Sequence, residues 1–91
     1  MVLKPGPNAA RDDVKSIIWE HARNNFKLRA EGLLSIVCPA AQESEIVGVG
    51  IFNADAETVQ ERLKEDPAIR EGVFTYQLFP VRSFPGDSLP S

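Results

Sequence analysis

The sequence predicts an α+β fold, in which a four-stranded antiparallel sheet carries two helices on one face. The chain has 91 residues, which is enough for one small hydrophobic core but not for two. Segments with the apolar period of a strand and segments with that of a helix follow in the order β-α-β-β-α-β. The predicted strands are apolar on both sides, so both faces of the sheet need cover.

A brief strand followed by a long helix is predicted for the first part of the chain. The strand begins around Val2, and it must lie at an edge or end by Lys4, because Pro5 has no N–H for a ladder bond. The helix is predicted over about 10–31. Its inward face consists of residues three or four apart: Val14, Ile17, Ile18, His21, Asn25 and Leu28.

The remaining elements follow from shorter apolar segments separated by turn residues. In chain order, they are strands at 33–38 and 46–52, a helix at 56–65, a further helical turn at 68–71 and a last strand at 73–82. Pro67 interrupts the second helix and opens the extra turn. Residues 83–91 contain Pro85, Gly86 and Pro90 and form a tail without a core of its own.

The order β-α-β-β-α-β is that of a ferredoxin-like sheet with both helices on one face. Residues 1–82 are therefore expected to form a single domain, followed by the tail 83–91. The helices cover one sheet face, and a second copy of the same sheet is the simplest cover for the other. We therefore expect a homodimer that pairs through its sheet faces, with the tail lying along the partner subunit or mobile.

Composition narrows the classes of partner. Ten basic and 13 acidic residues give a net charge of −3, and the basic residues are scattered, so no nucleic-acid partner is expected. No apolar stretch is long enough for a membrane span, and no secretory signal is visible. A single cysteine and a single histidine exclude an internal disulfide and a closed Cys/His zinc site within one chain. These features favour a cytoplasmic protein without a metal.

Two spaced motifs resemble a known family. His21 precedes Gly32 in a His-x10-Gly pattern, and a helix that starts near Asp55 leads into Asp66-Pro67-x4-Gly72-Val73. Over roughly residues 2–82, the chain resembles the YCII-like family of the dimeric α+β barrel superfamily. The resemblance implies a ferredoxin-like protomer that dimerises sheet to sheet, and an active site on His21 and Asp66. It also implies a link to lactone or chlorinated-aromatic breakdown.

His21 and Asp66 are the candidate catalytic pair. Imidazole titrates near neutral pH and suits general acid–base catalysis, and a carboxylate in contact would hold its tautomer. The alternatives are a half-buried histidine bonded to backbone and an aspartate that only caps the turn after Pro67. We predict that the two side chains meet, with about 3–4 Å between a ring nitrogen and a carboxylate oxygen, and face a cavity.

Two further residues are candidates for ligand binding. Asn25 lies one helical turn beyond His21 on the same face and needs a polar partner, and Tyr76 is expected to be either a pocket wall or core. Cys38 is interpreted as a small buried hydrophobic residue at the end of a strand. Trp19 and Phe26 are interpreted as packing or interface residues.

These residues support proton-transfer chemistry, of the isomerase or lyase type, on a small cyclic acid or lactone. No separate nucleophile or metal set accompanies the pair, and no cofactor is expected. The main alternative is a non-catalytic homodimer that binds a ligand or acts as an accessory protein. A weaker alternative is haem binding with His21 as the axial ligand.

Overall fold

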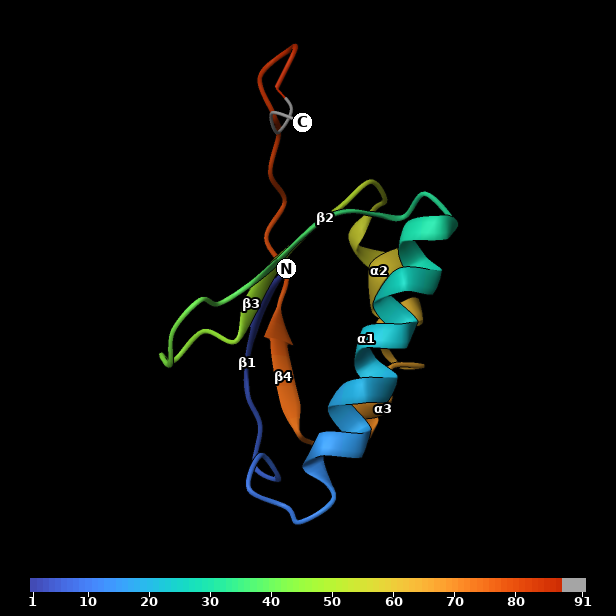
Figure 1. Ribbon diagram of the computed structural model, residues 1–91. Coiled ribbons are helices and arrows are strands. Elements are labelled where there is room, and N and C mark those ends of the chain that lie inside the picture. Colours follow the sequence, from blue (N-terminus) through green and yellow to red (C-terminus); the bar gives the residue numbers. More distant parts are fainter. Residues whose placement is uncertain (88–91) are drawn as a thin grey trace.

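The computed structural model describes residues 1–87, and in them four strands form one antiparallel sheet in the order β2-β3-β1-β4. The elements, in chain order, are β1 (Val2–Pro5), α1 (Val14–Ala30), β2 (Leu34–Pro39), β3 (Gly48–Phe52), α2 (Ala56–Leu63), α3 (Pro67–Arg70) and β4 (Phe74–Gln77). All three helices lie on the same side of the sheet (Figure 1). None of the helices within this described part is long and apolar enough to cross a membrane.

Strand β1 contradicts the expectation that Pro5 would confine it to an edge or end it by Lys4. It lies between β3 and β4 and includes Pro5. The Leu3 carbonyl accepts a hydrogen bond from the Val47 N–H at 2.7 Å, so Leu3 and, two residues later, Pro5 direct their backbone groups toward β3. The paired part of β3 ends opposite Leu3, so the N–H that proline lacks has no strand to bond.

Helix α1 begins at Val14, later than the predicted start near residue 10. The segment before it is tied to the turn after α3. The Asn8 N–H donates to the Gly72 carbonyl at 2.9 Å, and the Arg11 guanidinium pairs with the Glu71 carboxylate at 2.9 Å. These contacts hold residues 6–11 in turns, which the helical period of the sequence does not reveal.

Strand β4 ends at Gln77, although the apolar pattern predicts a strand over 73–82. Gln77 pairs with Val2, so the residues after it run past the end of the neighbouring strand. Of the predicted tail, residues 83–87 are all exposed and lie outside the core, as expected. Residues 88–91 lie outside the described part of the chain.

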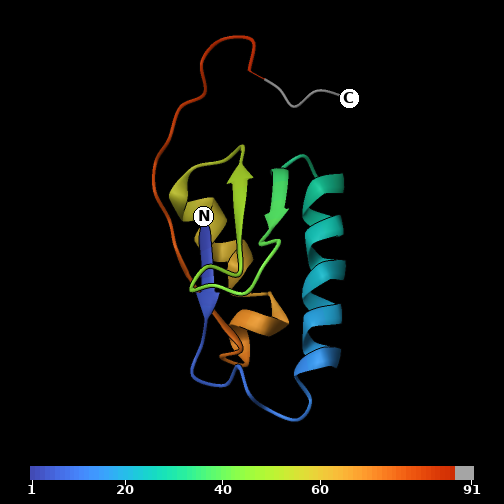
Figure 2. The ribbon, with the colours of Figure 1, turned by 60° about the vertical axis from the view of Figure 1, so that its left-hand side comes forward.

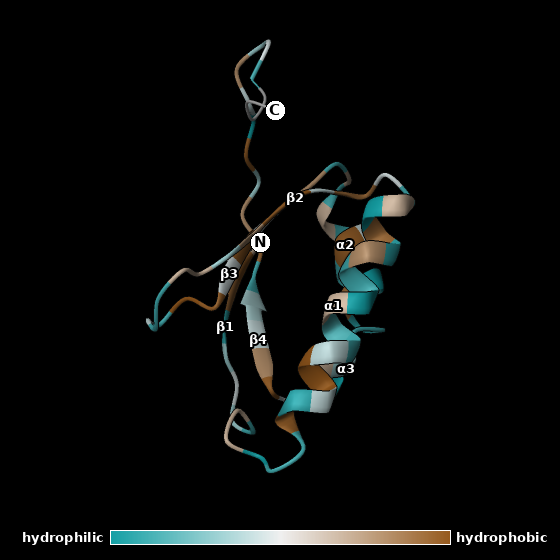
Figure 3. Cartoon of the chain, viewed as in Figure 1, coloured by the Kyte–Doolittle hydropathy of each residue, from teal (hydrophilic) through white to brown (hydrophobic). Residues whose placement is uncertain are grey.

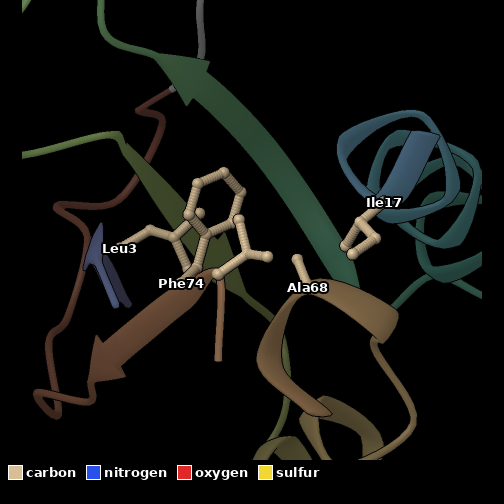
Figure 4. Close-up of a cluster of buried hydrophobic side chains, with 5 residues drawn as sticks. Leu3, Ile17, Ala68 and Phe74 are labelled. Carbon is tan, nitrogen blue, oxygen red and sulfur yellow. The ribbon is translucent and has the colours of Figure 1, made fainter. Parts of the chain in front are cut away.

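A cluster of buried side chains joins the helices to the sheet. Leu3 and Phe74 from the strands meet Ile17 of α1 and Ala68 of α3 (Figure 4), and Val73 completes the cluster. Ala68 and Val73 are fully buried. The cluster fixes α1 and α3 against β1 and β4, and so fixes the positions of the candidate pair, which lies on these two helices.

The sheet face away from the helices carries mainly apolar side chains. Leu3 is buried on the helix side, so the alternation of a strand places Val2 and Lys4 on the other face, together with the residues paired to them. We call this the open sheet face. Its apolar members are Val2, Ile36, Cys38, Val49 and Ile51, and its polar members are Lys4, Thr75 and Gln77. Apolar residues follow β2 and β3 in the hydropathy view (Figure 3).

Helix α2 has a cap that makes its stability depend on pH. The Asp55 carboxylate accepts a hydrogen bond from the Thr58 N–H at 2.8 Å, and this bond holds the pKa of Asp55 below its usual value. Because the folded pKa lies below the unfolded one, the cap stabilises the fold above the unfolded pKa. This stabilisation is lost as the pH falls through the folded pKa.

Replacing Asp55 with alanine should therefore lower the Tm by a few degrees at pH 7, and by less at pH 2. Asp55→Asn keeps a capping oxygen and should retain most of the Tm at pH 7. Thermal unfolding followed by circular dichroism at both pH values measures the effect. An equal deficit of the alanine variant at pH 7 and pH 2 would contradict the prediction.

Candidate active site

The structure brings His21 and Asp66 into direct contact. His21 Nδ1 lies 2.6 Å from Asp66 Oδ2, although the two residues are 45 positions apart in the sequence. The predicted contact between the two side chains is confirmed. The side chain of His21 is 12% exposed and that of Asp66 is 1% exposed, so the carboxylate is sealed inside while the ring reaches a little solvent.

The turn between α2 and α3 fixes the direction of the Asp66 carboxylate. Pro67 begins α3, and Asp66 is the residue that caps it. Oδ1 accepts a hydrogen bond from the Ala68 N–H at 2.9 Å, which leaves Oδ2 for His21. The sequence allowed two roles for Asp66, a cap of the following turn and a contact with His21, and one carboxylate performs both.

His21 is oriented by its neighbours as well as by the helix. Ile17 and Leu28 are buried on the inner side of α1 and hold the helix against the rest of the fold. The ring of Phe74 meets the imidazole edge to face, with centroids 5.2 Å apart and planes at 79°. The contact of Phe74 with His21 was not predicted from the sequence. Phe74 stands two residues before Tyr76 in one strand, and this spacing places both side chains on the helix side of the sheet.

Asn25 contacts the other ring nitrogen. Its Nδ2 lies 3.3 Å from His21 Nε2. When Nδ1 carries the ring proton and donates it to Asp66, Nε2 has a lone pair that accepts a hydrogen bond from the Asn25 amide. The polar partner that the sequence required for Asn25 is therefore His21 itself.

A pocket of about 220 Å³ lies between α1 and the sheet. His21 and Asn25 line it from the helix, together with Ile18 and Ala22, and Leu3, Leu34 and Phe74 are among the strand residues that close it. Asp66 is not among the lining residues and lies behind the imidazole. Within residues 1–87, no lysine, arginine or carboxylate side chain lines this pocket.

The pocket exists because β3 has two glycines on the side of the sheet that faces the helices. Gly48 and Gly50 are buried and alternate with Val49 and Ile51, which point to the open sheet face. A methyl group at Gly50 would approach the ends of the Leu34 and Met1 side chains, at 3.2 Å each. Any larger side chain at this position would occupy the cavity.

The structure places Tyr76 and Cys38 differently from the catalytic pair. Tyr76 is half-buried and packs against the core cluster, and it is not among the described residues that line the pocket. Phe74, two residues earlier in β4, lines the pocket instead. The prediction that Cys38 is buried is wrong: Cys38 lines the pocket but is exposed, and it is paired with Val49 in the sheet.

Several charged side chains form ion pairs outside the pocket. The two guanidinium nitrogens of Arg62 lie 2.9 and 2.7 Å from the carboxylate oxygens of Glu31, and this hydrogen-bonded pairing holds the pKa of Glu31 below its usual value. The pair ties α2 to the end of α1. In the part of the chain that is described, no group of three His, Cys, Asp or Glu side chains is placed to hold a metal ion.

Comparisons with protein-family models, with curated proteins and with solved structures found no match for this chain. The resemblance to the YCII-like family therefore depends on the motifs around His21 and Asp66. The chemistry of the site has to be argued from the pair, the amide and the pocket.

Proposed function

We propose that this protein binds a small cyclic organic molecule between α1 and the sheet and transfers a proton within it, as an isomerase or lyase does. One observation carries the proposal. His21 joins a sealed carboxylate at Nδ1, 2.6 Å away, to a pocket with apolar walls that the ring itself lines. A fixed tautomer beside an apolar cavity is what a general base requires.

The contacts of His21 suit proton abstraction next to a carbonyl group. With the Nδ1 proton donated to Asp66, Nε2 takes a proton from a ligand carbon and the electron pair moves onto the carbonyl oxygen. The Asn25 amide, 3.3 Å from Nε2, is near enough to donate a hydrogen bond to that oxygen. Return of the proton to a different carbon shifts the double bond, and Asp66 stabilises the imidazolium that forms in between.

The lining of the pocket favours a lactone over a free acid. A carboxylate buried without a cation is strongly disfavoured, and no lysine or arginine among residues 1–87 lines the pocket. The α-ammonium group of Met1, which is a lining residue, already donates a hydrogen bond to the Gly50 carbonyl at 2.8 Å. A volume of about 220 Å³ also lies below the range of about 300–1,000 Å³ that is usual for drug-sized ligands. The best candidate is an uncharged single ring with a carbonyl group. The same small volume makes haem the weakest of the candidate ligands.

We also propose that the chain is a YCII-like, ferredoxin-like protomer and that two copies pair through their open sheet faces as a dimeric α+β barrel. The sheet order β2-β3-β1-β4 with helices on one side supports the protomer fold. The apolar members of the open sheet face support the pairing, since Val49 and Ile51 are 37% and 38% exposed in the single chain. The pocket lies on the other side of the sheet.

A non-catalytic ligand-binding homodimer is the second candidate. The observation that favours it is the hydrogen bond from Asn25 to Nε2, which already occupies the lone pair that a base would use. The two candidates share the pocket and differ in turnover. The same ligand panel therefore distinguishes them.

The test is proton exchange and double-bond migration in a panel of five-membered unsaturated lactones, followed by NMR in D₂O. We expect catalysed exchange at a carbon next to the carbonyl group and a fall of about 100-fold or more in His21→Ala. Glu20→Ala, an exposed neighbour on α1, is the matched control and should keep the wild-type rate. Binding without exchange would establish the ligand-binding candidate, and exchange that survives in His21→Ala would contradict the proposed mechanism.

Gly50→Ala tests the pocket independently of the histidine. The added methyl group projects toward the ends of Leu34 and Met1, which are flexible, so the free energy of unfolding should change by less than about 1 kcal/mol. The ligand loses space, and its Kd or KM should rise by about tenfold. Titration and urea denaturation of the same sample measure both quantities. Unchanged ligand affinity would place the ligand outside this pocket.

A further inference from the structure

The chain after β4 carries large apolar side chains in solvent. Residues 78–81 border a hollow together with Met1, the end of β3 and the start of α2. The chain then continues beyond the sheet and the helices (Figures 1 and 2). Phe79 is 56% exposed, Val81 is 69% exposed and Phe84 is 79% exposed. Three exposed residues of this size on one short segment mark an interaction surface rather than scattered surface side chains.

The far end of this segment has local structure that the core does not impose. Residues 84–87 form a turn in which the Asp87 N–H donates to the Phe84 carbonyl at 3.0 Å and the Phe84 N–H donates to the Asp87 carboxylate at 3.0 Å. Pro85 and Gly86, with a φ of 88° at the glycine, fit the two central positions of a type II turn. The turn holds Phe84 in one backbone geometry before any partner binds, which lowers the entropy lost on docking.

The apolar side chains of the segment follow the edge of the open sheet face. Thr75 and Gln77 of β4 belong to that face. Two more steps of two residues reach Phe79 and Val81, beyond the end of β4 at Gln77, and both side chains are exposed. Exposed apolar residues therefore follow directly on the strand that forms the edge of the open sheet face.

A second copy of the chain is the partner that suits both the open sheet face and this segment. Charged residues are depleted at the centres of interfaces, and Lys4 is the one charged residue among the assigned members of the open sheet face. Residues 78–81 lie near the end of their own sheet around Ile51, and the segment then continues beyond the sheet, so it leaves most of the open sheet face uncovered within one chain. The six residues before the turn, 78–83, reach about 20 Å if they are extended, which is about the width of a four-stranded sheet.

We propose that residues 78–87 dock on the second copy of this chain, with Phe79, Val81 and Phe84 as anchors, so that each subunit of the dimer holds the other by its tail. A specific interface buries about 800 Å² on each partner, and one phenylalanine contributes about 150–250 Å². Two phenylalanines therefore supply a substantial part of what a small sheet face needs to pair stably. The inference rests on the proposed pairing of two copies and is independent of the chemistry of His21.

The first experiment measures the dimer dissociation constant of the full chain by sedimentation equilibrium. Phe84→Ser should weaken the dimer by about 30-fold or more, since a buried aromatic anchor is removed. Phe79→Ser should act in the same direction. Phe26→Ser is the matched control, because Phe26 is 69% exposed on α1, away from the open sheet face, and its loss should leave the constant unchanged.

The second experiment locates the docked tail. A spin label on Ser83→Cys, in a Cys38→Ser background, is mixed with unlabelled ¹⁵N chain, and amide signals of Val49 and Ile51 in the unlabelled chain should broaden. A stable dimer that tolerates Phe84→Ser and shows no broadening between chains would overturn tail docking alone. A monomer at micromolar concentration would overturn tail docking together with the pairing, and neither result would affect the exchange assay on His21.

Discussion

Replacing Asp66 with alanine should lower the free energy of unfolding by about 3 kcal/mol. The variant loses the cap of α3, because no carboxylate oxygen accepts the hydrogen bond of the Ala68 N–H. It also leaves His21 Nδ1 without its partner, beside the buried space that the lost side chain had filled. The side chain of Asp66 is 1% exposed, so water cannot replace either contact without entering the core. Urea denaturation followed by circular dichroism measures the loss.

Two variants separate the causes of this loss. Asp55→Ala removes a cap of the same type from the exposed start of α2, and it should destabilise the protein much less than Asp66→Ala. Asp66→Asn has one acceptor oxygen, so if that oxygen keeps the Ala68 bond, the amide NH₂ faces Nδ1 and forces the ring proton onto Nε2. Asp66→Asn should therefore retain much of the stability and lose the exchange activity. Equal stability losses in Asp55→Ala and Asp66→Ala would contradict the dual role of Asp66.

Gly6→Ala should destabilise the protein by about 3 kcal/mol, although the substitution adds one methyl group. The new Cβ would clash with the Gly72 carbonyl oxygen, and it would lie 2.9 Å from the Gly72 carbonyl carbon and 3.1 Å from that of Val73. All three atoms are backbone. Relief therefore requires the strand end to separate from the turn, which breaks the 2.8 Å hydrogen bond from the Gly6 N–H to the Val73 carbonyl.

Gly50→Ala is the matched control for Gly6→Ala. Its new methyl group meets the ends of flexible side chains instead of backbone, so the same substitution should have little effect on unfolding. Denaturation curves of both variants under identical conditions provide the comparison. Similar unfolding free energies for Gly6→Ala and Gly50→Ala would show that the contact between Gly6 and the turn at Gly72 is not tight.

The sequence predicted the α+β class and the element order from patterns within single strands and helices. It predicted the His21–Asp66 contact from the topology that these elements imply and from the family resemblance. His21 points inward from the middle of a long helix, and Asp66 precedes Pro67 at a helix end. Once both helices lie on the same sheet face, the two side chains are directed toward the same region. The sequence also predicted that residues 83–87 lie outside the core. In each case the local pattern and the tertiary arrangement agree.

The features that the sequence did not predict depend on contacts between distant segments. Helix α1 starts late because Asn8 and Arg11 bond the turn at 71–72, and β1 tolerates Pro5 because β3 no longer pairs with it there. Phe74 was not predicted as the neighbour of the imidazole, and Tyr76, for which the sequence left a pocket wall or core open, packs against the core cluster. The two belong to the same strand and the same sheet face, so the placement of α1 along β4 decides which of them reaches His21.

The central place of β1 has a consequence for how this protein is made. A chain emerges from the ribosome N-terminus first, so β1 is synthesised early and its neighbour β4 late. The pairing of Val2–Pro5 with Phe74–Gln77 can form only after both segments have been synthesised, and pairings between residues so distant in sequence form slowly. We therefore expect the nascent chain to complete its fold only after release of residue 77. The contact of His21 with Phe74 then arises in that same late step, so a nascent chain that ends before β4 lacks it.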